Sequence, residues 1–121
     1  MQDRPTAVEL LEAVREFLER DLMANLDGRL QFHTRVSVNV LATVIRELEL
    51  GADHDASQRA RLVAILGDTD ATTDGLERQL AAALRNGTLD ATQYAAADAH
   101  VRATVHEKLL VANPKYLEPD T

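Results

Sequence analysis

The sequence predicts an all-α protein, an irregular four- to five-helix bundle in which the helix at about 30–50 is central. Apolar residues recur every three to four positions in five separate stretches, the period of an amphipathic helix. Alanine, the strongest helix former, is abundant. Short loops join the stretches, which favours antiparallel packing of neighbours. At 121 residues the chain predicts a single helical domain, 1–121, with 114–121 a mostly extended tail.

The first predicted helix spans about 7–24. Thr6 and Glu9 form a T-x-x-E capping box, in which each side chain accepts a hydrogen bond from the other residue's backbone N–H. The apolar residues of this stretch share one helical face, and charged residues occupy the other. The apolar set is Leu10, Leu11, Val14, Phe17, Leu18 and Leu22, and the charged set is Glu9, Glu12, Glu16, Glu19 and Arg20.

The second predicted helix, about 30–50, lies between Gly28 and Gly51. Gly51 suits the position just after a helix end, because glycine adopts positive φ without a Cβ penalty. The run 36–40 alternates Val with Ser and Asn, which is also typical of a strand. We reject the strand because valines and leucine continue at i+4 spacing to Leu48, which a strand would not maintain.

A third helix is expected at about 56–66, capped by Asp55 or Ser57 and ended by Gly67. It should bury Leu62, Ile65 and Leu66. The preceding residues, 53–55, are interpreted as a polar turn between the second and third helices.

Two further helices complete the prediction, at about 75–86 and 91–112. Asp74 or Thr73 should cap the first, and Gly87 should close it. Asp90 and Gln93 resemble a second capping box, and Pro114 stops the last helix. The expected apolar faces are Leu76, Leu80, Ala83 and Leu84 on one helix, and Tyr94, Ala97, Val101, Val105, Leu109 and Ala112 on the other.

Charge and composition exclude several classes of function. The formal net charge is −7, and only two lysines occur, which argues against binding a phosphate backbone. The absence of cysteine excludes disulfides and thiol catalysis and fits a reducing cytoplasm. The start of the chain lacks the apolar core of a signal peptide, and no apolar run approaches the length of a membrane span. We therefore expect a cytoplasmic protein that binds neither nucleic acid nor membrane.

No motif of catalysis, cofactor binding or metal ligation is complete. The loop that starts at Asp68 resembles half of a calcium loop, but Thr73 and Gln79 stand where glycine and a bidentate glutamate belong. None of the four histidines has a histidine partner at i+4. Structural or surface positions are expected for His33, His54, His100 and His106. The sequence therefore predicts a protein that is not an enzyme and holds no cofactor or metal.

The helix at 30–50 carries polar groups on two sides. A helical wheel places His33 and Ser37 on the face of Val40 and Val44, which predicts an interior polar network that sets helix packing. Arg35, Asn39 and Arg46 gather on the opposite side, with apolar residues among them. Buried polar groups need partners, so one interpretation is an internal hydrogen-bond network. The other is contact of this second side with another protein or a ligand.

Two sequence blocks resemble a family of small bacterial proteins of unknown function. The first runs from Arg4-Pro5-Thr6-Ala7 through 32–36 and Asn39 to 46–51, and the second is 108–117. The middle, 52–90, is variable. Genes of this family typically lie beside aminoglycoside-phosphotransferase-like kinases and acyl-CoA dehydrogenase-like enzymes. The resemblance implies an accessory protein for a kinase acting on hydroxyacyl-CoA-type substrates, and it implies no catalytic residue.

The leading hypothesis is a non-enzymatic partner that binds and stabilises or activates a phosphotransferase-like kinase. The expected contact residues are Arg35, Asn39, Arg46, Lys115 and Tyr116. A second hypothesis is a small helical module that binds an acyl or acyl-CoA ligand, with Lys108, Lys115 and Tyr116 facing phosphates or adenine. A third is a homodimeric structural protein that associates through the helix at 30–50 or at 91–112.

Overall fold

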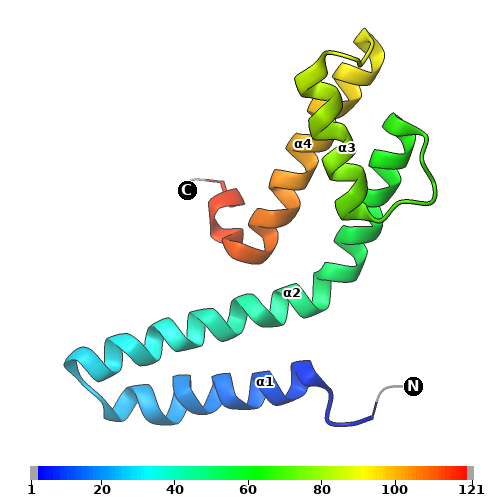
Figure 1. Ribbon diagram of the computed structural model, residues 1–121. Coiled ribbons are helices and arrows are strands. Elements are labelled where there is room, and N and C mark those ends of the chain that lie inside the picture. The colour runs from blue at the N-terminus through cyan, green and yellow to red at the C-terminus, as the bar shows by residue number, and fades with distance from the viewer. Residues whose placement is uncertain (1–2, 120–121) are drawn as a thin grey trace. The chain divides into compact units, whose positions relative to one another are not determined.

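The computed structural model describes residues 3–119 and confirms the all-α fold class (Figure 1). Within that range there is no strand. The α-helices are α1 (Ala7–Glu16), α2 (Gly28–Leu66), α3 (Thr73–Asn86) and α4 (Ala91–Ala112). Shorter helical segments are the π-helix η1 (Phe17–Leu22) and the 3₁₀ segments η2 (Met23–Asn25) and η3 (Pro114–Leu117).

The chain divides into two compact units, and each is described by itself. The N-terminal unit is Met1–Gly51, and the C-terminal unit is Ala52–Thr121. Because α2 runs from Gly28 to Leu66, it contributes residues to both.

The N-terminal unit begins with the predicted capping box. The backbone N–H of Thr6 donates to Glu9 Oε1 at 3.2 Å, and the N–H of Glu9 donates to Thr6 Oγ1 at 3.2 Å. The prediction of one helix over 7–24 needs refinement, because the α-helix gives way to η1 at Phe17 and then to η2. The chain leaves the helix at Leu26, whose backbone is extended.

The two helices of the N-terminal unit form an antiparallel hairpin, in which α1 runs beside the first part of α2 (Figure 1). Val38 and Ile45 are its buried apolar residues. The half-buried residues recur at the three- and four-residue steps of a helix–helix seam. They include Leu11, Arg15, Leu18 and Leu22 on the first helical arm of the hairpin and Gln31, Thr34, Leu41 and Ala42 on α2.

The predicted helix end at Gly51 and the separate helix at 56–66 are wrong, because α2 is continuous to Leu66. Gly51 keeps a negative φ, whereas Gly28, Gly67 and Gly87 have the positive φ that ends or begins a helix. Residues 53–55, predicted as a turn, contain no proline and remain helical. A mid-helix glycine costs only about 1 kcal/mol relative to alanine, less than breaking a helix into two with new ends.

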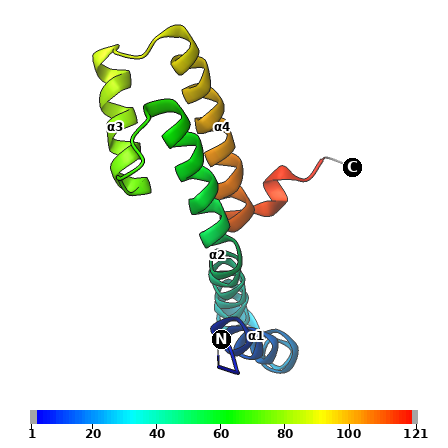
Figure 2. The same cartoon turned by 90° about the vertical axis from the view of Figure 1, so that its right-hand side faces the viewer.

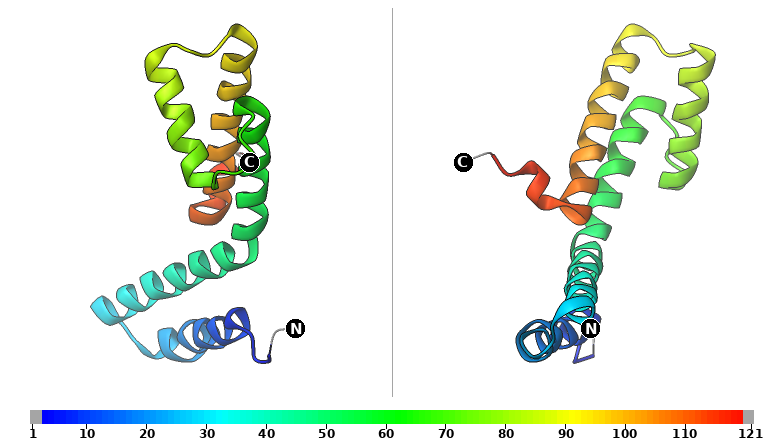
Figure 3. Two further views of the ribbon diagram at one scale, coloured as in Figure 1. Left: turned by 45° about the vertical axis from the view of Figure 1, so that its right-hand side comes forward. Right: turned by 90° about the vertical axis from the view of Figure 1, so that its left-hand side faces the viewer.

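In the C-terminal unit, the second part of α2 packs with α3 and α4 (Figures 2 and 3). The residues of its hydrophobic core are Leu62, Ile65, Leu76, Leu80 and Ala97. Burial of Leu62, Ile65, Leu76 and Leu80 matches the sequence prediction. The core cluster lies outside the segment 30–50, which was expected at the centre of the fold.

The caps of α3 and α4 use the residue types that the sequence predicts, but the N-cap of α3 lies one residue earlier than expected. Thr72, rather than Thr73 or Asp74, caps α3 by accepting the N–H of Gly75 at 3.1 Å. The left-handed Gly87 closes α3 as predicted. The capping box of α4 is confirmed, because the N–H of Gln93 donates to Asp90 Oδ1 at 2.8 Å and the N–H of Asp90 donates to Gln93 Oε1 at 3.0 Å.

Two details of the C-terminal part differ from the prediction. The buried side of α4 contains Ala97 and His100, whereas Tyr94, Val101 and Val105 are exposed. The tail predicted as mostly extended forms the 3₁₀ segment η3 after Asn113, and then becomes extended at Glu118. Pro114 supplies the first residue of that turn, a position where its missing N–H costs nothing. The last two residues of the predicted tail, 120–121, lie outside the described range.

Candidate functional site

The N-terminal unit exposes more apolar surface than its two helices can cover. Each helix has one neighbour within the unit, so only the seam side of each is shielded. The exposed large apolar residues here are Leu10, Val14, Phe17, Leu30, Phe32, Val36, Val40, Val44 and Leu48. Contiguous apolar exposure of this kind marks interaction surfaces in soluble proteins.

Seven of these residues lie on one side of the hairpin. At 100° per residue, the exposed apolar set of each helix is centred about 100° around the helix from its seam. On both helices the exposed set is rotated from the seam in the same direction, when each helix is viewed along its own chain direction. Because the two helices are antiparallel, both exposed sets then lie on the same side of the hairpin. We call this set the apolar face; it consists of Leu10, Val14, Phe17, Leu30, Val40, Val44 and Leu48.

A depression at the open end of the hairpin agrees with this placement. Its volume is about 380 Å³, and its lining brings Ala7 and Val8 of α1 together with Leu48 of α2. Ala7 and Leu48 both belong, by helical geometry, to the side that carries the apolar face. The two helices therefore do present that side together.

The opposite side of α2 carries the predicted contact residues. Arg35 and Asn39 are exposed, and Arg46 is half-buried with one guanidinium nitrogen donating to Thr43 Oγ1 at 3.2 Å. Exposed apolar residues are interspersed among them. We call this surface the arginine flank; it consists of Phe32, Arg35, Val36, Asn39, Thr43 and Arg46. The flank contains two arginines, Arg35 and Arg46, and residues 28–46 contain no acidic residue, while Glu9 and Glu16 of α1 lie on the same side of the hairpin.

The interior position predicted for His33 and Ser37 is wrong, since both residues are exposed. The Ser37 hydroxyl donates to the backbone carbonyl of His33 at 2.9 Å, and the His33 ring meets Phe32 edge-on with centroids 5.5 Å apart. These contacts are local to one helix. The seam of α2 is centred near Val38 instead of Val40, which turns the side with His33 and Ser37 away from α1.

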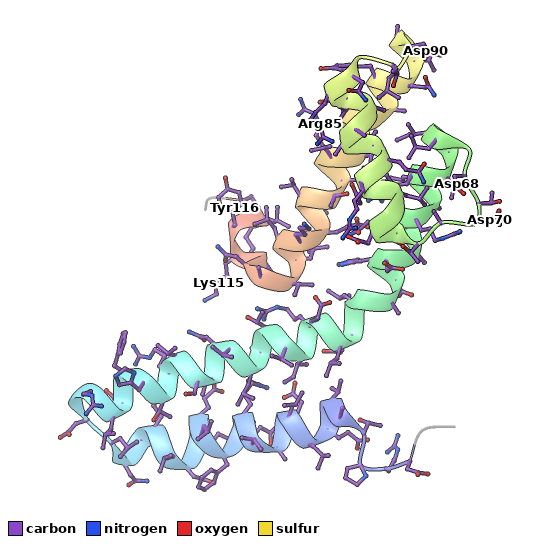
Figure 4. The ribbon with its side chains drawn as sticks, viewed as in Figure 1. Asp68, Asp70, Arg85, Asp90, Lys115 and Tyr116 are labelled. Atoms are coloured by element: carbon purple, nitrogen blue, oxygen red, sulfur yellow. The ribbon has the colours of Figure 1, made fainter. Side chains whose placement is uncertain are left out.

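Lys115 and Tyr116 lie on η3 in the C-terminal unit and are exposed (Figure 4). The structure therefore brings Arg35, Asn39 and Arg46 together on one helix side, and it places Lys115 and Tyr116 in the other unit.

The C-terminal unit contains a buried polar network that the sequence prediction did not identify. His100 of α4 is 1% exposed. Its Nδ1 accepts from Arg61 Nε of α2 at 3.0 Å, and its Nε2 lies 2.9 Å from Glu77 Oε1 of α3. Arg61 also donates to Glu107 Oε1 at 2.7 Å and to Thr104 Oγ1 at 3.3 Å. The network thus joins all three helices of the unit.

The geometry assigns the tautomer of His100. Arg61 has only N–H donors, so Nδ1 must accept, and the ring proton of a neutral imidazole then sits on Nε2 and is donated to Glu77. Within the described residues, no buried side-chain nitrogen or oxygen lacks a hydrogen-bond partner. His100 therefore has both ring nitrogens engaged and serves to hold the helices together.

Glu107 carries the electrostatic part of this network. Its side chain is 13% exposed, and hydrogen bonding to the Arg61 guanidinium lowers its pKa, while partial burial opposes that shift. His100, Thr104 and Glu107 stand at i, i+4 and i+7 and share one face of α4. The sequence signal for the network is therefore this spacing of three polar residues on α4, together with an arginine beside the core leucine of α2.

The loop between α2 and α3 uses its oxygen atoms internally. Asp68 Oδ1 accepts from the backbone N–H groups of Asp70 and Ala71, and Oδ2 accepts from Gln79 at 2.9 Å (Figure 4). The hydrogen bond from Gln79, followed by that from the Asp70 N–H, lowers the pKa of Asp68. No group of three potential metal ligands occurs among residues 3–119.

Two depressions lie beside α4. One, of about 190 Å³, is lined by Glu77, His100, Thr104 and Lys108, with Val101 and Val105. The other, of about 160 Å³, is lined by Leu84, Tyr94, Ala97, Asp98 and Val101. Both are smaller than the roughly 300–1,000 Å³ of typical small-molecule sites.

In the described part of the chain, no helix combines the length and the apolar content needed to cross a membrane.

Comparison with known proteins places the chain in a family. No curated protein and no solved structure matches the chain. A family described as a domain of unknown function, DUF6285, matches residues 24–116, a range that includes all of α2, α3 and α4. The chain therefore belongs to the DUF6285 family.

Proposed function

We propose that this protein is a non-enzymatic accessory protein that binds a phosphotransferase-like kinase acting on hydroxyacyl-CoA-type substrates, and stabilises or activates it in the cytoplasm. The observation that supports a binding role is the exposed arginine flank of α2. Arg35 and Asn39 reach solvent there beside the exposed Phe32 and Val36.

The composition of the flank suits a protein partner. Arginine and aromatic residues are enriched at the energetic centres of protein–protein interfaces. Phe32 supplies a large apolar ring, and Arg35 supplies a planar group that forms paired hydrogen bonds with carboxylates. The partner surface that fits this flank combines acidic side chains with an apolar pocket.

The identity of the partner rests on the family resemblance described from the sequence. The two sequence blocks that carry it include Phe32, Arg35 and Asn39, so the resemblance and the exposed flank concern the same helix. A kinase encoded beside the gene is therefore the first partner to test.

The experiment is co-expression of this protein with the neighbouring kinase, followed by affinity purification and a kinase assay. We expect the two to co-purify and the kinase to gain activity or thermal stability. Arg35→Glu should weaken the complex at least about tenfold, because it places a carboxylate against an acidic partner surface.

Arg102→Glu is the matched control, since Arg102 is an exposed arginine of α4 that pairs with Asp98 at its own surface. It should leave the complex unchanged. If the proteins never co-purify and kinase activity is the same with and without this protein, the proposal fails. An equal effect of both substitutions would remove the flank as the contact surface.

Binding of an acyl-CoA ligand is the second candidate, and the location of Lys108 favours it. Lys108 lines the depression of about 190 Å³ beside His100, where its ammonium group could meet a phosphate. The small volume and the net charge of −7 weigh against it. Thermal unfolding measured with CoA esters tests it, and the absence of any stabilisation would remove it.

A further inference from the structure

We propose that the apolar face of the hairpin binds the same face of a second copy of this chain, giving a two-fold symmetric four-helix bundle. This surface is distinct from the arginine flank, so the inference is independent of the proposed kinase complex. Three features of the hairpin support this dimer: the angle between the seam and the apolar face of each helix, the exposed area of the face, and its charge.

The angle is that of a four-helix bundle. In such a bundle each helix packs against two neighbours that lie roughly at right angles around its axis. On α1 the seam residues include Leu11 and Leu18, and the apolar face of that helix is centred about 100° away. On α2 the seam around Val38 and the face around Val44 are separated similarly. Each helix thus has one side for its hairpin neighbour and a second for a further helix.

The area is that of a protein interface. Each of the seven residues of the apolar face is about half exposed. Because Leu and Val are smaller than the roughly 150–250 Å² aromatic side chains, the seven residues leave roughly 600 Å² per copy, at the lower end of specific interfaces. Among residues 3–51, only Val38 and Ile45 are buried apolar residues, so a second copy would provide most of the core of this unit.

The charge of the face favours a second copy. Two copies of a protein with a net charge of −7 repel each other, and a contact surface with few charges adds least to that repulsion. Asp21 of η1 lies on the same arc, and Arg29 and Glu47 of α2 lie at its edge; its other residues, Ala7, His33 and Ser37, are uncharged when histidine is neutral. On the opposite side of the hairpin, Glu9 and Glu16 of α1 accompany Arg35 and Arg46 of α2. Within the hairpin, identical copies therefore bring fewer charged residues together through the apolar face than through the opposite side.

The test is the mass of the full-length chain in solution, measured by light scattering and sedimentation equilibrium over a dilution series. The wild type should have twice the monomer mass of 13.3 kDa at micromolar concentration. Val44→Glu should raise the dissociation constant at least about a hundredfold, because two carboxylates would be forced into an apolar contact.

Val36→Glu is the matched control. Val36 is also a valine of α2 and is 43% exposed, compared with 41% for Val44, but it lies about 80° around the helix, in the arginine flank. It should change the dissociation constant by less than about threefold. Circular dichroism should show the same helix content for both variants, because both side chains already face solvent in the single chain.

Val14→Glu provides a second test from α1 and should also give monomers. A wild-type mass of 13.3 kDa at every concentration would overturn the proposal. An equal effect of Val44→Glu and Val36→Glu would also overturn it. Arg35→Glu should leave the dimer intact, so a failure of the kinase complex and a failure of self-association are distinguishable.

Discussion

The two units of this chain differ in how much of their apolar surface is covered. The C-terminal unit buries a core of five apolar residues together with His100. Among residues 3–51, the N-terminal unit buries Val38 and Ile45 and exposes nine large apolar side chains, whereas the described residues of the C-terminal unit expose five, Leu84, Tyr94, Val101, Val105 and Tyr116. In the first, three helices pack around one core, whereas in the second, each helix has a single neighbour. The number of neighbours, rather than the apolar content of the helices, decides how much of each helix is covered.

The apolar arc of a helix can be wider than the seam that one partner helix covers. On α1 the predicted apolar side divides in the structure, because Leu11 and Leu18 are half-buried and Leu10, Val14 and Phe17 are exposed. One partner helix covers a seam formed by residues at steps of three and four. Residues beyond that seam are covered only where a further helix packs against them.

The largest expected contrast is between Leu62 and Leu48. Leu62→Ala should lower the free energy of unfolding by about 3 kcal/mol, because it removes a fully buried side chain and leaves a cavity. Leu48→Ala should cost less than about 1 kcal/mol in the dilute, monomeric chain, where this side chain is half exposed.

Urea unfolding followed by circular dichroism at several protein concentrations measures both effects. The Leu62→Ala loss should not depend on concentration, whereas the Leu48→Ala loss should grow as dimers form. Equal losses for the two variants would contradict the difference between the units.

A smaller effect is expected from Glu107, which tests the polar part of the C-terminal unit. Its pKa is lowered in the folded chain, so its stabilisation is present above its ordinary value of 4.5 and is lost as the pH falls through the lower folded value. Glu107→Gln should cost about 1–2 kcal/mol at neutral pH, because the charge-assisted bond from Arg61 is removed.

The unfolding free energies of wild type and Glu107→Gln, measured from neutral pH to below 4.5, should therefore converge in acid. Glu49→Gln in the N-terminal unit is the control, because Glu49 is exposed. It should change stability by less than about 0.5 kcal/mol. A constant difference between wild type and Glu107→Gln at all pH values would refute the role given to ionised Glu107.

The smallest effects are expected from two glycines and should have opposite signs. Gly51→Ala should stabilise the chain by about 0.5–1 kcal/mol, because Gly51 is helical and a new Cβ meets only the flexible end of Glu47, at 3.1 Å. Gly87→Ala should destabilise by about 1 kcal/mol, because the φ of 65° at this helix end is strained for alanine.

Thermal unfolding of both variants checks this pair. Destabilisation by Gly51→Ala would argue for a helix end at Gly51 after all, and a neutral Gly87→Ala would argue against the left-handed cap.

Local elements were predictable because their signals lie within a few residues. The capping pairs Thr6–Glu9 and Asp90–Gln93 were identified correctly, as was the closing Gly87. The end at Gly51 was not, because a glycine signals a helix end only where φ is positive, and the sequence does not determine φ.

The candidate sites were predicted in part. The grouping of Arg35, Asn39 and Arg46 on one side of a helix follows from the helical period alone. The prediction that His33 and Ser37 are interior was wrong, because the side of α2 that becomes buried depends on where α1 packs. The network of Arg61, His100 and Glu107 spans more than forty residues of sequence, and no local pattern indicates which helices meet.

The sequence by itself determined that this chain is helical, where most of its helices start and stop, and which side chains share a helix side, because backbone propensity, capping and the 3.6-residue period act over short distances. Only the tertiary structure decided which of those sides is covered. Burial depends on which helices become neighbours, and that choice leaves the apolar face and the arginine flank of the N-terminal unit exposed.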